Sequence, residues 1–410
     1  MVAAGCSYGG GHTAPRSWLL LGSLGVSQTV GYGVLIYAFA VYLHPMASEL
    51  HASPGAITAA MTLAVLITAA AAVPVGRWLD QHGGRGLMTA GSILATLSVV
   101  AWSRVTSVAG LYVVFAGIGV ASAIVLYEAT FAVVIAVTEP RRRSSAILTI
   151  TIIAGFASTI FLPLTATLVE RYGWRDSLLV LAVLLGTVTI PIHATLVPRR
   201  GAPAASGAVH AIDTDSMVRE ALRDRGFWLM VTAFTAHSAA ITIVIVHLVA
   251  YLVTLGHPVT FAASITGLLG VLSVTGRLVV TGLGRRWSMA TLTAAVFAIQ
   301  AFAIAVLPLV GRLGVGAAAC VVLFGLGFGI GTIARPILLA QRYGTNGYAT
   351  IAGALTLPLT IAKATGPLVA AVLITAAHSY LPAVAIVSAG CLVSTLCLAL
   401  LARDGERRAG

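Results

Sequence analysis

The sequence predicts an all-α membrane protein with twelve transmembrane helices in two pseudo-symmetric six-helix bundles. Of its 410 residues, 59% are hydrophobic and only 9% are charged, whereas a soluble domain carries about 25% charged residues. The apolar runs are long and continuous, without the alternation of period two that a transmembrane barrel shows. One polar segment near the middle of the chain separates them into two equal sets. The chain is therefore expected to fold in lipid.

Twelve apolar runs reach the length of ~20 residues that a helix needs to cross a bilayer. The first six are expected at 17–43, 54–76, 86–103, 108–137, 145–168 and 176–197, and the second six at 227–254, 260–283, 288–310, 314–340, 349–377 and 381–402. Residues 198–226 between them are polar and then charged, which predicts a loop with a short amphipathic helix around Ser216–Asp224. The expected domains are an N-terminal half (1–197), a central cytoplasmic loop (198–226) and a C-terminal half (227–410).

The formal net charge of +12 does not indicate a nucleic-acid partner, because the arginines form short clusters between apolar runs and no basic face or arm. Membrane topology explains the clusters. If the N-terminus is cytoplasmic, the outer segments contain only four arginines, Arg104, Arg171, Arg175 and Arg312. The positive-inside rule then predicts that both termini lie in the cytoplasm, with a bacterial inner membrane as the expected location. The four cysteines have no metal-ligand spacing, so no metal or cofactor is expected.

The two sets of spans resemble each other in sequence. Trp18–Leu20 at the start of the first span is echoed by Trp228–Met230 at the seventh. Gly76–Arg85 at the end of the second span is echoed by Gly276–Arg285 at the end of the eighth. Internal duplication of this kind is typical of secondary transporters.

The segment GRWLDQHGGR at residues 76–85 resembles the signature G-x-x-x-D-R/K-x-G-R/K of the major facilitator superfamily, with Gln81 in place of a basic residue. The resemblance implies the twelve-helix fold of that superfamily and transport by alternating access. It also implies a tight cytoplasmic turn, in which an aspartate can cap a neighbouring helix or pair with an arginine across the two halves. Gly76, Asp80, Gly83 and Arg85 are accordingly expected to take part in gating.

Within the superfamily, the chain resembles the monocarboxylate porters and the related oxalate/formate antiporter. The resemblance rests on Arg277 in the eighth span and on Lys363 in the eleventh, just before Gly366-Pro367. The fifth span lacks the G-P-x-x-G-G run of drug/proton antiporters. The resemblance implies a secondary transporter, expected to be monomeric, that moves a small organic anion such as a carboxylate by symport or exchange, with proton coupling as one option.

Three alternatives to this function remain at the level of sequence. The first is efflux of a drug-like molecule or another metabolite by proton antiport. The second, from a different class, is an integral-membrane lipid-modifying enzyme, which would need a cluster of His, Asp, Glu or Ser near one interface. The third is a sensor that has lost transport. No GxxxxGK[ST] loop occurs in the chain, so a gradient or an exchanged substrate has to supply the energy.

Four charged side chains lie well inside the predicted spans: Glu128, Arg277, Arg335 and Lys363. A charge in the bilayer centre costs at least ~2.5–3.5 kcal/mol and therefore marks a candidate functional site. Lys363, the sole lysine of the chain, and Arg277 are expected to bind the anion. The alternatives are a permanent ion pair of Lys363 with Glu128 and a purely structural Arg277 that corresponds to the arginine of the 76–85 turn.

Glu128 and Arg335 occupy matching positions in the fourth and tenth spans. They are expected to approach across the two halves and to form a breakable gate. An ion pair that never breaks, or a proton-coupling role for Glu128, are the alternatives. Gln28, Tyr32 and His237 are expected to line the substrate pocket, unless neighbouring helices satisfy their polar groups.

Overall fold

The computed structural model describes residues 14–199, 214–284 and 286–409. Residues 200–213 of the predicted central loop, and Arg285 of the internal echo, lie outside these ranges. Every regular element in them is a helix. The first half contains α1 (Ala14–Tyr32), η1 (Gly33–Tyr37), α2 (Ala38–Glu49), α3 (Pro54–His82), α4 (Gly84–Ser103), α5 (Val108–Val125), α6 (Tyr127–Val137), η2 (Pro140–Arg142), α7 (Arg143–Gly155), α8 (Ala157–Pro191) and η3 (Ile192–Leu196). The second half contains α9 (Thr214–Arg223), α10 (Arg225–Thr254), α11 (Val259–Leu283), α12 (Met289–Val310), α13 (Gly314–Gly327), α14 (Gly331–Tyr343), α15 (Tyr348–Ala377) and α16 (Leu381–Ala409).

Eleven helical segments of the described chain are long and apolar enough to cross a membrane. One of them, Pro140–Leu196, has 57 residues, and at a rise of ~1.5 Å per residue it is more than twice as long as the hydrocarbon core is thick. It contains the predicted fifth and sixth spans. Helix α8 turns back at Gly173, where φ is 76° and ψ is 168°, a conformation that a glycine adopts without strain. The arrangement is therefore that of twelve membrane-crossing helices.

Two predicted spans that carry interior charges are interrupted in the middle; the fifth span also has a single turn residue, Phe156, between α7 and α8. The fourth is divided into α5 and α6 by Leu126, whose backbone is extended, and the tenth into α13 and α14 by turns at residues 328–330. The apolar runs 108–137 and 314–340 predict continuous helices there. Broken helices occur at membrane depth only where protein or a water-filled cavity satisfies the released backbone groups. The two breaks therefore mark the region in which a polar site can exist.

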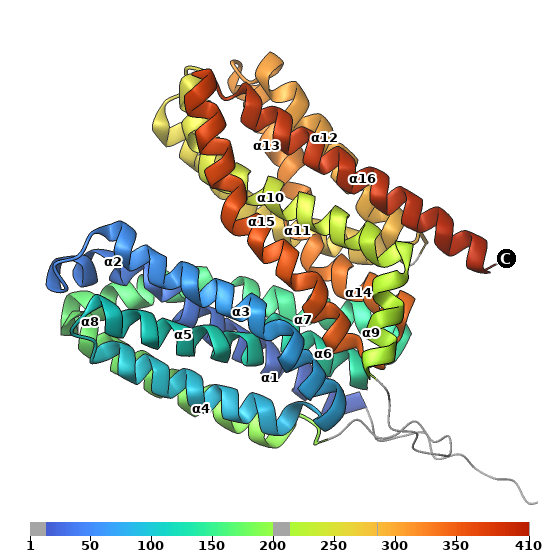
Figure 1. Cartoon of the computed structure of the whole chain (residues 1–410). Coiled ribbons are helices and arrows are strands. Elements are labelled where there is room, and N and C mark those ends of the chain that lie inside the picture. The colour runs from blue at the N-terminus through green and yellow to red at the C-terminus, as the bar shows by residue number, and fades with distance from the viewer. Residues whose placement is uncertain (1–13, 200–213, 285, 410) are drawn as a thin grey trace, which may run out of the picture.

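The buried side chains form three clusters. One cluster contains only residues 30–185 and another only residues 240–391, whereas the third joins residues of both halves, from Leu21 to Leu401. The halves thus pack against each other at one end of the molecule, here called the closed end, which carries residues 76–85, 138–143, 214–228 and 342–350. At the opposite end, with residues 50–53, 104–107, 255–258 and 311–313, each half has its own core; this is called the open end. Figure 1 shows the two sets of helices diverging toward it.

The predicted amphipathic helix of the central segment is confirmed as α9, which lies at the closed end against α10 and α15. Asp224 after α9 accepts hydrogen bonds from Arg342 Nε at 2.5 Å and Nη2 at 2.9 Å, and from the Tyr343 hydroxyl at 2.7 Å. The Arg342 guanidinium holds the pKa of the Asp224 carboxyl well below its usual range. The Asp224–Arg342 ion pair is therefore complete at any pH at which a free carboxyl is ionised. Its stabilising effect is lost only in acid strong enough to protonate Asp224 in the folded protein.

Candidate functional site

Asp80, at the end of α3, caps a helix of the other half. Its carboxylate accepts hydrogen bonds from the backbone N–H of Ala349 at 3.1 Å and of Thr350 at 2.9 Å, and from the Thr350 hydroxyl at 2.8 Å. These N–H groups belong to the first turn of α15, where an acidic side chain is favoured by the positive end of the helix dipole. Of the two roles that the sequence allowed for Asp80, the structure shows the helix cap.

Glycines permit this contact between α3 and α15. A Cβ at Gly76 would lie 2.3 Å from the carbonyl oxygen of Ala349, and one at Gly353 would lie 2.5 Å from that of Ala72. Both neighbours are backbone atoms, which no rotamer change can move aside. The halves therefore approach to backbone contact at two points along one interface.

The rest of the 76–85 turn stays within the first half. Gly83 ends α3 with φ 80° and ψ 173°, which allows α4 to begin at Gly84. Arg85 donates from Nε to the Val197 carbonyl at 2.6 Å and from Nη2 to that of Thr195 at 2.8 Å. Its contacts tie the turn to the end of the sixth span, whereas the sequence analysis had grouped Arg85 with residues that act between the halves.

Glu128 and Arg335 meet across the two halves, through Glu128 Oε1 and Arg335 Nη2. Both are half-buried, with side-chain exposures of 30% and 15%. Each lies in the half-helix that follows a break, α6 for Glu128 and α14 for Arg335. The breaks place both charges at the level where the halves meet.

Arg277 also bridges the two halves. Its Nε donates to the Gly329 carbonyl at 3.2 Å, and its Nη1 donates to the Thr151 carbonyl of α7, in the other half, at 3.2 Å. Gly329 is one of the residues between α13 and α14, and a Cβ there would lie 2.3 Å from Arg277 Nε and 2.2 Å from Ser273 Oγ. The break in the tenth span thus supplies both an acceptor and the space for the guanidinium.

Lys363 has an exposed side chain and no hydrogen bond or ion pair among the described residues. It lies close enough to Glu128 and Arg335 for charge–charge interactions with both, and also interacts electrostatically with His237. Since Glu128 pairs with Arg335 instead, the alternative of a permanent Lys363–Glu128 pair does not hold in this structure. Lys363 is the charged group of the interior that is left available for a ligand.

Three tyrosines of the first half lie beside these cations, and the sequence analysis singled out only one of them, Tyr32. The rings of Tyr32 and Tyr127 have centroids 4.6 Å apart. Tyr37 and Tyr127 both interact electrostatically with Arg277, and the Tyr37 side chain is 37% exposed. Tyr37 ends the π-helix and Tyr127 begins α6, so only the irregular backbone at these places brings them together.

Gln28 and His237 are enclosed, which corrects the expectation that they line the pocket. Gln28 is fully buried and donates from Nε2 to the Val125 carbonyl at 2.7 Å and to Thr130 Oγ1 at 2.8 Å, so it braces the break between α5 and α6. His237 is 4% exposed, donates from Nε2 to Gln300 Oε1 at 2.9 Å and stacks on Phe297. Neighbouring helices bind the Gln28 amide nitrogen and the His237 ring, as the alternative interpretation held, whereas the buried Gln28 Oε1 has no hydrogen-bond partner among the described residues.

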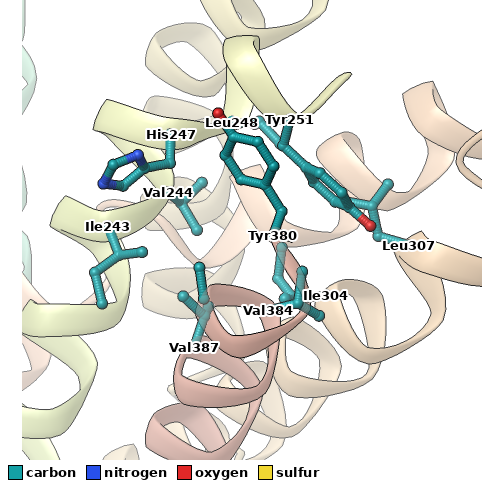
Figure 2. Close-up of a pocket in the computed structure, with 11 residues that line it drawn as sticks. Ile243, Val244, His247, Leu248, Tyr251, Ile304, Leu307, Tyr380, Val384 and Val387 are labelled. Carbon is teal, nitrogen blue, oxygen red and sulfur yellow. The ribbon is translucent and has the colours of Figure 1, made fainter. Parts of the chain in front are cut away.

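An apolar pocket of about 30 Å³ lies in the second half toward the open end, between α10, α12 and α16. Figure 2 shows Tyr251 of α10 and Tyr380, the residue before α16, with aliphatic side chains around them. His247 at its edge donates from Nε2 to the Pro367 carbonyl at 3.1 Å. The lining of this pocket is aliphatic and aromatic apart from His247 and contains no arginine or lysine, so it offers an organic anion no cation to bind.

Solved structures with similar backbones include three transporters. The E. coli fucose:proton symporter FucP is 16% identical with a TM-score of 0.65, over 95% of this chain and 98% of that one. The proton:xylose symporter XylE, bound to 6-bromo-6-deoxy-D-glucose, is 13% identical with a TM-score of 0.64, over 93% and 95%. The human organic anion transporter TETRAN is 14% identical with a TM-score of 0.66, over 94% and 99%. At these identities the likeness concerns the fold.

The sequence model of the Major Facilitator Superfamily matches residues 25–367, which is most of the chain and includes the 76–85 turn and all four interior charges. The multi-pass helical fold and the contacts between two sets of helices agree with this match. The match and the neighbours in fold support a role in secondary transport. The protein belongs to the major facilitator superfamily.

Proposed function

We propose that this protein moves a small organic anion, a carboxylate in the first place, across the membrane by alternating access between the halves 1–197 and 227–410. The observation that supports this proposal is Lys363, an interior cation that has no hydrogen bond or ion pair with any residue that the structure describes. In that part of the chain, Glu128 is the one acid among the charges inside the spans, against Arg277, Arg335 and Lys363, which leaves an excess of positive charge between the halves. An anionic substrate would neutralise that excess, whereas a cationic one would add to it.

The orientation follows from charge. The closed end carries exposed arginines at residues 77, 141, 142, 199, 219, 223, 225, 286 and 403. At the open end, arginines are fewer, and Arg175 pairs with Glu49 at 2.9 Å. By the positive-inside rule, the closed end with both termini is cytoplasmic in an inner membrane. The structure then represents an outward-open state, in which Arg277 and Lys363 receive the anion from outside.

The test of the proposed substrate class is a thermal-shift screen of purified protein against mono- and dicarboxylates, run beside Lys363→Met. A ligand at a hundred times its dissociation constant stabilises by about 2.7 kcal/mol, which is a measurable rise in Tm. We expect a carboxylate to raise the Tm of the native protein and to leave that of Lys363→Met unchanged, with Lys363→Arg as the charge-retaining control. An equal shift in native protein and Lys363→Met would contradict the anion site. Sugars in the same screen test neutral substrates, since two neighbours in fold are sugar symporters.

Arg277 is proposed to couple binding to gating, because in the substrate-free state its guanidinium holds a neutral carbonyl of the other half. A carboxylate is a stronger acceptor for arginine than a peptide carbonyl. Binding would therefore draw Arg277 away from Thr151 and remove one contact that keeps the closed end closed. The proposal explains why the same residue would bind substrate and bridge the halves.

For Arg277→Gln we expect anion affinity to fall by about 10- to 100-fold, as the loss of a charge-assisted hydrogen bond of ~1.5–3 kcal/mol implies. We also expect the substrate-free protein to adopt more often the opposite state, in which the open end has closed and the closed end has opened. The measurement is a spin-label distance between cysteines at Arg104 and Arg312, one in each half at the open end, in a background without native cysteines. Lys363→Gln is the matched control, expected to lose binding without a change in this distance. An unchanged distance in Arg277→Gln would exclude the bridging role.

A further inference from the structure

The tryptophans of this protein are distributed unevenly between its two ends. Four have exposed side chains: Trp18 at 61%, Trp78 at 50%, Trp228 at 53% and Trp287 at 60%. All four lie at the closed end, at the start of α1, the end of α3, the start of α10 and the turn before α12. The other two, Trp102 and Trp174, belong to the open end and are buried at 0% and 6%.

Arginine accompanies the exposed tryptophans. Arg77 precedes Trp78, and Arg286 precedes Trp287, and both arginines are exposed; Arg225 lies one helical turn before Trp228. No lysine takes such a position, because Lys363 is the only lysine of the chain. Arginine differs from lysine in that its planar guanidinium can bind two phosphate oxygens at once.

The indole N–H groups also need acceptors. Trp228 donates to the Leu222 carbonyl at 2.8 Å. Trp78 is fixed by stacking on His82, with ring centroids 4.4 Å apart, but neither its N–H nor that of Trp287 has a hydrogen bond within the ranges that the structure describes. At the level of the headgroups, the acceptors available to an indole are phosphate and ester oxygens, which suit an aromatic side chain with one apolar and one polar edge.

We propose that Arg77–Trp78 in the first half and Arg286–Trp287 in the second form binding sites for the headgroups of anionic phospholipids in the leaflet at the closed end. The guanidinium binds the phosphate, the indole N–H donates to a phosphate or ester oxygen, and the ring packs on the upper acyl chain. A negative leaflet surface attracts each such arginine. The two sites hold both halves to the same leaflet, independently of what the transporter carries.

The test uses quenching of tryptophan fluorescence by lipids with brominated acyl chains. The protein is reconstituted in vesicles of dioleoylphosphatidylcholine with increasing brominated phosphatidylglycerol or, separately, brominated phosphatidylcholine. Since Trp102 and Trp174 are buried, quenching reports on the four exposed rings. We expect the anionic lipid to quench at a lower mole fraction, and Arg77→Gln or Arg286→Gln to weaken this preference about fivefold each.

Arg312→Gln, at the open end, is the matched control and should keep the preference. The emission maximum of each variant before addition of brominated lipid verifies that it is folded. Soluble glycerol phosphate, added in excess, should not relieve the quenching if a membrane lipid is the ligand; relief would mean that the sites bind free phosphate esters and would overturn the proposal. Equal quenching by the two lipids in the native protein, or an equal loss in Arg312→Gln, would also overturn it.

Discussion

Replacing Gly76 by valine is expected to prevent full closure of the closed end. The new Cβ would lie 2.3 Å from the Ala349 carbonyl oxygen and 2.7 Å from the Thr350 nitrogen, and neither backbone atom can move without shifting α15. Overpacking strain of this kind is typically about 1–3 kcal/mol, which corresponds to a change of about 5- to 150-fold in the ratio of two states. The strain exists only while α3 and α15 are in contact, so it acts against the state seen here.

The spin-label pair at Arg104 and Arg312 measures the consequence: the open-end distance of Gly76→Val should move to shorter values, and transport should fall because one of the two states is disfavoured. Gly86→Val is the matched control, in the adjacent helix α4, where a Cβ would meet no atom within 4 Å. If Gly86→Val changes the distance as much as Gly76→Val, or if neither changes it, the contact between α3 and α15 does not control closure.

Exchange of the charges of Glu128 and Arg335 is the second change with a large expected effect. Each single variant, Glu128→Arg or Arg335→Glu, would place two like charges together in a half-buried position. Removing one partner of a buried pair destabilises by about 3–5 kcal/mol, and the exposure of these two side chains places the expected effect at the lower limit. Both single variants should therefore lose transport, and the open-end distance should shorten as the closed end opens.

The double variant with both exchanges restores opposite charges and tests the alternatives that the sequence left open. A gate needs only an ion pair that breaks, so the double variant should recover transport. If Glu128 instead carries the coupled proton, it cannot be replaced by an arginine, and the double variant should restore the distance but not substrate accumulation. If the double variant restores neither the distance nor transport, the surroundings of position 128 require a negative charge there, and the gate interpretation would be wrong.

Much of the fold follows from the sequence alone. Apolar runs of ~20 residues can satisfy their backbone in lipid only as helices, which predicts the number of spans and an all-α fold. The 76–85 turn also follows, because Gly83 has to adopt a positive φ there. Glu128 and Arg335 were expected to meet, since an isolated charge within a span requires a partner.

The break in the fourth span could not be predicted, whereas the one in the tenth lies in a glycine-rich stretch, LFGLGFGIG at residues 323–331, which weakens a helix. Residues 123–129, AIVLYEA, contain no glycine or proline that would interrupt a helix, and the break at Leu126 depends on Gln28 of another helix, which bonds to both of its sides. Hydropathy also could not show that Gln28 and His237 pack against neighbouring helices and do not line the pocket. It shows that a polar residue lies in a span, but not which neighbour its side chain faces.

The sequence by itself determined which charges lie in the membrane and that one lysine stands apart, because composition and length alone decide the cost of each charge in lipid. Only the tertiary structure decided which of these charges are already paired. Glu128 bonds to Arg335, and Arg277 bridges to Thr151, so that Lys363 has no hydrogen bond or ion pair within residues 14–199, 214–284 and 286–409. The physical reason is that pairing depends on distances across the two halves, over more than 100 residues of chain, and helix packing sets those distances.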